Sequence, residues 1–148
     1  MLERELKGEF LIDSDVFLSY FKADELVKHS EKVINLILDN KIIAYVSSIL
    51  YDDLVTCLLS VGVDIDMIIN TISRLSAIPH ISLPLSPVIV ITALRLYKKF
   101  GDPRKLHYFD SYHVATSQYY DYPLITSDKF IIENADKLKI DVINLREI

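Results

Sequence analysis

Two segments of the chain place aspartate directly behind a short apolar run. Phe10–Leu18 contains Asp13, and Tyr122–Phe130 contains Asp128. An apolar run is typical of a strand buried in a parallel sheet, and such sheets bind ligands at the carboxyl ends of their strands. We therefore expect Asp13 and Asp128 to share one edge of a sheet. An acidic pocket at that edge either binds a hard metal ion or needs another counter-charge.

Two further aspartates lie on predicted helices. In Ser48–Val61, helical geometry of about 100° per residue puts Asp53 roughly 75° from the centre of the apolar stripe, and turns Asp52 toward solvent. Asp53 is therefore the candidate of this pair for a chemical role. Asp110 begins another predicted helix. His113 lies one turn further on the same side, and we interpret it as a packing or hydrogen-bonding residue.

Each aspartate also has a simpler structural explanation. Aspartate is a favoured N-cap, which would account for Asp13 and Asp128. It is also favoured in the first turn of a helix, which would account for Asp110. Acidic pairs such as Asp52 and Asp53 are usually solvated surface charges. The order of these residues along the predicted elements carries more information than any one of them.

The elements that would position these residues alternate along the chain. Predicted strands are Glu9–Ile12, Ile42–Val46, Pro123–Thr126 and Asp141–Leu145. Predicted helices are Val16–Phe21, Asp24–Asp39, Ser48–Val61, Asp64–Ser76, Pro87–Phe100, Asp110–Tyr120 and Lys129–Leu138. This alternation predicts an α/β fold of three layers, α/β/α, around a mostly parallel central sheet. The length of the chain favours a single domain over residues 1–148.

Local signals mark the ends of some elements. Ser86 and Pro87 are typical of an N-cap followed by proline at the first helical position, and Gly101 is typical of a helix end. Ile78–Leu85 contains two prolines and is predicted to be a loop.

The composition narrows the class of protein. A net charge of −5 argues against a generally basic nucleic-acid binder, although bound divalent cations would make the working charge less negative. The single cysteine, Cys57, excludes an internal disulfide and a cysteine-based zinc cluster. A hydrophobic content of 51% with a mean hydropathy of +0.26 predicts a self-interface, and hence a homodimer. No apolar run approaches the roughly 20 residues of a membrane span, and Met1–Lys7 is unlike a signal peptide, so the cytoplasm is expected.

Four segments of this sequence resemble the PIN domain family, the metal-dependent ribonuclease fold that includes VapC toxins. They are Phe10–Leu18, Ser47–Leu54, Phe109–Thr116 and Leu124–Phe130. The resemblance implies a catalytic and metal-binding set of Asp13, Asp53, Asp110 and Asp128 that holds Mg²⁺ or Mn²⁺. It further implies an RNA substrate and a small antitoxin protein as partner. One residue departs from the family, which usually has Glu where this chain has the shorter Asp53.

Residues near these four have supporting roles in this interpretation. Ser14, Asp15, Thr126 and Ser127 are candidates for a second shell around the carboxylates. Lys99, Arg104 and Lys105 precede Asp110 and are candidates for contacts with RNA phosphates.

Two other functions remain open from the sequence. In a haloacid-dehalogenase-like phosphatase, Asp13 would be the nucleophile and Asp15 the acid/base. However, the Gly101-Asp102 pair follows a helix rather than a strand, which is the wrong context for that class. The other alternative is a PIN-like module with a degraded site that binds RNA or protein without catalysis. The shorter Asp53 is the observation that suggests it.

Overall fold

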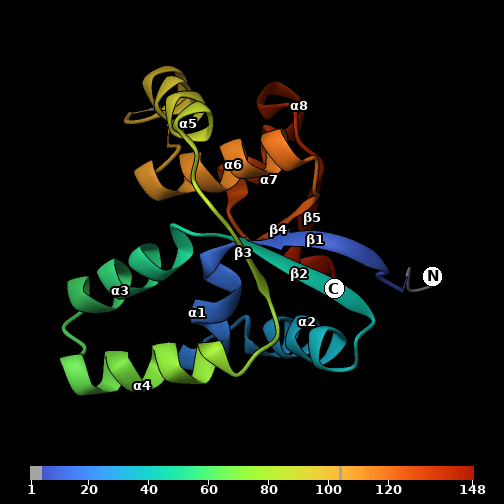
Figure 1. Ribbon diagram of the computed structural model, residues 1–148, viewed down its shortest axis with the longest axis vertical. Coiled ribbons are helices and arrows are strands. Elements are labelled where there is room, and N and C mark those ends of the chain that lie inside the picture. The colour runs from blue at the N-terminus through green and yellow to red at the C-terminus, as the bar shows by residue number, and fades with distance from the viewer. Residues whose placement is uncertain (1–4, 104) are drawn as a thin grey trace.

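The computed structural model describes residues 5–103 and 105–148 (Figure 1). These residues form one five-stranded sheet in the order β3-β2-β1-β4-β5. All four strand pairings are parallel. The strands are β1 (Gly8–Ile12), β2 (Ile42–Ser47), β3 (Ile81–Leu83), β4 (Leu124–Thr126) and β5 (Val142–Asn144).

Helices cover both faces of the sheet, so the predicted three-layer α/β/α fold is confirmed (Figure 1). The chain first moves from β1 outward to β3 and then returns to add β4 and β5 on the other side. Because crossovers between parallel strands are right-handed, this reversal puts the two sets of helices on opposite faces. One face carries α1 (Ser14–Lys22), α2 (Val27–Leu38), α3 (Leu50–Ser60) and α4 (Ile65–Ser76). The other carries α5 (Pro87–Phe100), α6 (Tyr108–Tyr120), α7 (Lys129–Glu133) and α8 (Ala135–Leu138).

The alternation of side chains along β1 divides the apolar core in two. Ile12 packs in the cluster under α1–α4, together with Phe17 of α1. Leu11 points the other way and packs in the cluster under α5–α8, together with Val114 of α6. Successive side chains of a strand face opposite sides of the sheet, so a strand buried on both faces must be apolar throughout. This explains the continuous apolar runs from which the strands were predicted.

Most predicted elements are present, with shifted ends. The N-terminal signals of α5 are confirmed: Pro87 is in its first turn, and the Ser86 hydroxyl accepts a hydrogen bond from the Ile89 amide at 3.4 Å. Gly101 is the C-cap of the same helix. The predicted helix Lys129–Leu138 is interrupted at Asn134, which separates α7 from α8.

The prediction that Ile78–Leu85 is a loop is wrong, because the segment contains β3. This strand has only three residues and pairs with β2 alone, through partners such as Tyr45 and Ile81. Its two prolines, Pro79 and Pro84, flank the strand without interrupting its hydrogen bonds, as proline can at the edge of a sheet.

β1 and β4 lie side by side at the centre of the sheet, while the chain leaves their carboxyl ends toward opposite faces. Open α/β sheets bind ligands at such a reversal point. Asp13 directly follows β1, and Asp128 lies two residues after β4. The topology therefore delivers both residues to one crevice. Among the described helices, none has the length and apolar character needed to span a membrane.

Candidate active site

A cleft of about 370 Å³ opens at this crevice. All four candidate aspartates line it, although they come from four separate parts of the chain. The full lining is Asp13, Ser14, Asp15, Leu18, Asp53, Cys57, His107, Phe109, Asp110, Ser127 and Asp128.

The carboxylate of Asp13 is turned into this cleft and does not cap a helix. Asp13 occupies the N-cap position of α1, but its side chain accepts no capping hydrogen bond. Instead, its Oδ2 accepts a hydrogen bond from the Thr126 hydroxyl at 2.7 Å, and its Oδ1 accepts a longer one from the Ser14 hydroxyl at 3.3 Å. The residue is only 1% exposed. The simple capping explanation therefore fails at this position.

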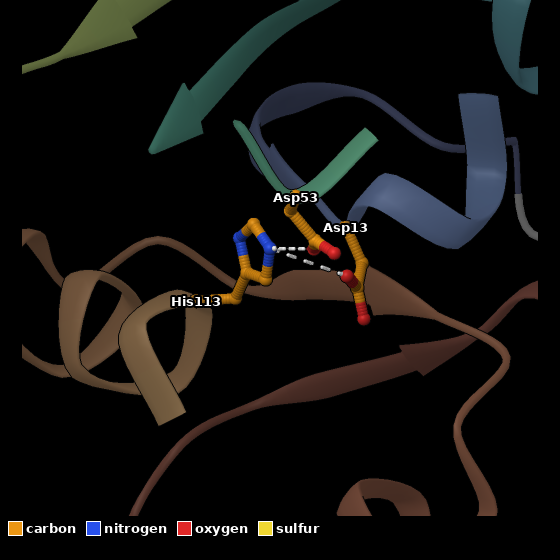
Figure 2. A group of neighbouring side chains, drawn as sticks. All are labelled: Asp13, Asp53 and His113. Carbon is orange, nitrogen blue, oxygen red and sulfur yellow. Dashed lines mark hydrogen bonds and ion pairs between the residues drawn. The ribbon is translucent and has the colours of Figure 1, made fainter. Parts of the chain in front are cut away.

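Asp53 enters the cleft from α3 and meets His113 of α6. Its Oδ2 accepts hydrogen bonds from the Ser14 hydroxyl at 2.6 Å and from Nε2 of His113 at 2.9 Å. The same nitrogen lies 3.7 Å from Oδ1 of Asp13, so the ring faces both carboxylates (Figure 2). Asp53 is buried and Asp52 is exposed, as the helical pattern predicted. We call Asp13, Asp53 and His113 the inner group.

A second cluster lies nearer the solvent. Side-chain ligand atoms of His107, Asp110 and Asp128 lie within 4.8 Å of one another, and we call these residues the outer group. Nδ1 of His107 is 3.2 Å from Oδ2 of Asp110. Oδ1 of Asp128 accepts a hydrogen bond from the Ile131 amide at 2.9 Å, so this aspartate does cap α7. Capping and lining the cleft are compatible for Asp128, because capping occupies only one of its two oxygens.

The candidate second-shell residues hold the two strand ends together. Oδ2 of Asp15 accepts hydrogen bonds from the amide of Ser127 at 2.7 Å and from the Ser127 hydroxyl. Thr126 donates to Asp13, and its hydroxyl also accepts a hydrogen bond from the Asp128 amide at 3.1 Å. Oδ1 of Asp15 is buried and has no hydrogen-bond partner among the described residues. These contacts fix the turn after β4 against the start of α1.

Burial and mutual repulsion raise the pKa of several of these carboxyls. Burial, followed by the charge of Asp13, raises the pKa of Asp110 to about 9 and that of Asp15 to about 7. The pKa of Asp13 is also raised, chiefly by burial. Burial alone would lower the pKa of His113, but the nearby Asp13 and Asp53 outweigh it and raise the value to about 9. A site whose carboxylates resist ionisation in this way favours an added cation.

Of the residues proposed for RNA contacts, the two that the structure describes do not line the cleft. Lys99 and Lys105 are exposed on the surface, outside the cleft lining. Arg104 lies outside the described residues.

Sequence reasoning missed the partners of two residues. The hydrogen-bonding role predicted for His113 is confirmed, but its partner is a candidate site carboxylate 60 positions away. Cys57 also lines the cleft, with its Sγ 3.8 Å from Oδ1 of Asp53. Helical spacing held a signal for the contact of Cys57, which follows Asp53 by four positions. For His113 the spacing of three from Asp110 indicated the side of the helix, but no local signal pairs it with Asp53.

Solved bacterial structures with a similar fold include a toxin–antitoxin complex. VapBC2 from Rickettsia felis, bound to a DNA fragment from its promoter, matches 92% of this chain and 98% of its own with a TM-score of 0.68 at 11% identity. FitAcB from Neisseria gonorrhoeae matches 94% and 99% with a TM-score of 0.62 at 20% identity. A toxin–antitoxin complex from Klebsiella pneumoniae matches 94% and 99% with a TM-score of 0.61 at 15% identity. At these identities the likeness shows a shared fold.

Comparison by sequence identifies the family. No curated protein matches the chain significantly. The family model of the PIN domain, however, matches residues 10–137, a range that contains the whole cleft lining. The chain therefore belongs to the PIN domain family, whose members are generally nucleases.

Proposed function

We propose that this protein is a metal-dependent endoribonuclease that hydrolyses the phosphodiester bonds of RNA. The observation that carries the proposal is the convergence of Asp13, Asp53, Asp110 and Asp128 on one cleft at the reversal point of the sheet. Family membership supports nuclease chemistry there and favours it over the phosphatase alternative.

The donor set of the cleft suits a hard divalent cation. Carboxylate oxygens are the ligands that Mg²⁺ and Mn²⁺ prefer, and these four are crowded enough to repel one another. The residues therefore fit Mg²⁺ or Mn²⁺, held by Asp13, Asp53, Asp110 and Asp128. Such an ion would supply Lewis-acid activation of a water molecule and neutralise charge on the phosphodiester.

The protein's own contribution is to fix the carboxylates before substrate arrives. Thr126 and Ser14 hold the buried oxygens of Asp13 and Asp53 by hydrogen bonds. Asp15 anchors the turn that carries Asp128. Orienting these groups in advance lowers the cost of reaching the reactive geometry.

RNA would approach from the solvent side of the outer group. Lys105 is exposed and lies two residues before His107, which lines the cleft. We propose that Lys99, Arg104 and Lys105 contact backbone phosphates flanking the bond that is cut. Phosphate contacts position a nucleic acid without reading its sequence.

We also propose that the protein is the toxin of a toxin–antitoxin pair, with a small antitoxin protein as its partner. One of the similar solved structures is a toxin–antitoxin complex and another is VapBC2, and the similarity covers nearly all of both chains. The homodimer predicted from the high hydropathy stays a prediction, which the molar mass in solution would check.

RNA cleavage by the wild type and by Asp13→Asn and Asp128→Asn, each with Mn²⁺ and with EDTA, tests the proposal. We expect cleavage only by the wild type with Mn²⁺. Activity that survives both substitutions would exclude this mechanism, and activity in EDTA would exclude the metal requirement.

The shorter Asp53 favours a second candidate function, a PIN module that binds RNA or protein but does not cut. One oxygen of its carboxylate, Oδ2, already accepts hydrogen bonds from Ser14 and His113, which leaves only Oδ1 for a cation. Melting temperatures with and without Mn²⁺ separate the two functions, because a ligand stabilises a protein only when it binds the folded state. An equal shift in the wild type and in Asp13→Asn would favour the non-catalytic module.

A further inference from the structure

The side chain of Asp53 is clamped by two donors from different elements. Ser14 at the start of α1 and His113 in the middle of α6 both donate to the same oxygen, Oδ2, at 2.6 and 2.9 Å. Because a carboxylate oxygen has two lone pairs, these donors occupy Oδ2 fully. The other oxygen, Oδ1, has only the weak Cys57 thiol donor at 3.8 Å among the described residues. The clamp therefore decides which oxygen of Asp53 is left for the cleft.

Among the described residues, the polar contacts of the buried His113 ring are with carboxylates of the cleft. The residue is 0% exposed, and its second ring nitrogen, Nδ1, has no hydrogen-bond partner among the described residues. Buried polar groups are normally paired, and Nε2 is the ring nitrogen of His113 that has partners. That nitrogen faces Asp53 at 2.9 Å and Asp13 at 3.7 Å (Figure 2).

The shortness of Asp53 makes its orientation decisive. Glutamate has one more methylene and can reach a cation through several side-chain conformations. Aspartate on the same helix has fewer, and an error of about 1 Å in the placement of a reacting group can cost roughly 100-fold in rate. A rigid donor on a neighbouring helix can select the one orientation that presents Oδ1 to the cleft.

We propose that His113 is a positioning residue that sets the affinity of the cleft for a divalent cation by fixing the carboxylate of Asp53. This inference rests on the proposed metal site, and it assigns to α6 a second task besides carrying Asp110. His113 acts through Asp53 and does not bind the cation itself. Groups that orient metal ligands in this way are worth about 10–100-fold in metal affinity.

The test is the affinity for Mn²⁺, measured by titration calorimetry or by EPR of the free ion. His113→Leu removes the donor, and we expect Mn²⁺ to bind about 10–100-fold more weakly. His113→Gln keeps an uncharged N–H donor near the position of Nε2, and we expect it to recover most of the affinity. His29→Gln is the matched control, because His29 is a half-buried histidine of α2 outside the cleft lining. Its affinity should equal that of the wild type.

Ser14→Ala provides a second variant in case His113→Leu does not fold, which circular dichroism would reveal. It removes the other donor to Oδ2 and should also weaken Mn²⁺ binding. A double-mutant cycle with Asp53→Glu sharpens the result, since the longer side chain should make the loss of His113 matter less.

Three results would overturn the inference. The first is wild-type affinity for Mn²⁺ in folded His113→Leu. The second is a nitrogen coupling in the pulsed EPR spectrum of Mn²⁺ bound to the wild type that disappears in His113→Leu, because it would make His113 a ligand. Both leave the proposed nuclease standing. The third is a wild type that neither binds Mn²⁺ nor cuts RNA, which would remove the proposed function as well.

Discussion

The inner and outer groups of the cleft have the same composition, two aspartates and one histidine, but opposite relations to water. Asp13, Asp53 and His113 are 1%, 4% and 0% exposed. In the outer group, the His107 side chain is 80% exposed and the Asp110 side chain 16%. The same residue types therefore make a buried hydrogen-bonded network in one place and a partly solvated hydrogen-bonded pair in the other.

The difference lies in what surrounds each carboxylate. Hydroxyls from two elements of the fold hold the carboxylates of the inner group, in the contacts of Ser14 with Asp53 and of Thr126 with Asp13. In the outer group, the Ile131 amide at the start of α7 donates to Asp128, and the contact of His107 with Asp110 is partly exposed. Buried polar networks are rigid when fully satisfied, whereas exposed pairs contribute little order. The inner group is thus organised in advance, and the outer group is the part that an arriving ion or substrate would order.

The largest expected effect comes from breaking the inner group at Asp13. Asp13→Asn keeps the size of the side chain and an oxygen for the Thr126 hydroxyl, but removes the charge. Substitution of a residue that merely orients a metal ligand lowers metal affinity or activity by about 10–100-fold. Asp13 is proposed as a ligand itself, so we expect RNA cleavage with Mn²⁺ to fall by at least about 100-fold. Initial rates at saturating Mn²⁺ check this, with folding followed by circular dichroism. Near-normal rates would show that the inner group is structural only.

A smaller loss is expected in the outer group, at Asp128. Asparagine caps helices as well as aspartate does, so Asp128→Asn should keep the melting temperature while activity falls about 10–100-fold. Asp136→Asn is the matched control, because Asp136 is an exposed aspartate in the first turn of α8. A large drop in melting temperature with little loss of activity would make Asp128 a cap and nothing more.

The contrast between the groups also marks what the sequence could predict. The strand-end positions of Asp13 and Asp128 followed from short apolar runs, since a strand buried on both faces must be apolar throughout. The inward position of Asp53 beside the exposed Asp52 followed from the helical period. These predictions rest on local geometry, which a single sequence contains.

Contacts between distant elements could not be predicted in the same way. His113 meets Asp53 because α3 and α6, which lie on opposite faces of the sheet, contact each other, and only the packed fold brings them together. Strand β3 was missed for another reason. Its three residues are mostly exposed and lie between prolines, so it has neither a buried run nor a clear alternation.

The metal-free protein should lose stability as the pH rises from about 6 to 9. The folded pKa of Asp110 is about 9 against 3.8, and that of His113 about 9 against 6.5. A raised folded pKa means that the folded state holds more protons, so stability falls with rising pH between the two values. The contribution of His113 is complete below pH 6.5 and is lost as the pH passes about 9.

Melting temperatures of the EDTA-treated protein across this range check the slope. Asp110→Asn should flatten it, because the variant removes a carboxylate that repels Asp13 and Asp128. A wild-type curve that rises toward pH 9, or a variant with an unchanged slope, would contradict the electrostatic picture of the cleft.

The smallest effect should come from His107, the outer counterpart of His113. Its ring lies 3.2 Å from Asp110, but its side chain is 80% exposed, so water and salt screen the interaction. Even a fully charged pair at the surface contributes only about 0.2–1 kcal/mol, so we expect the change in Mn²⁺ affinity of His107→Gln to be less than roughly fivefold. The same titration that measures His113→Leu gives the comparison directly. If the two substitutions weakened binding equally, burial would not distinguish the groups, and the cation would have to be held by the outer carboxylates as firmly as by the inner ones.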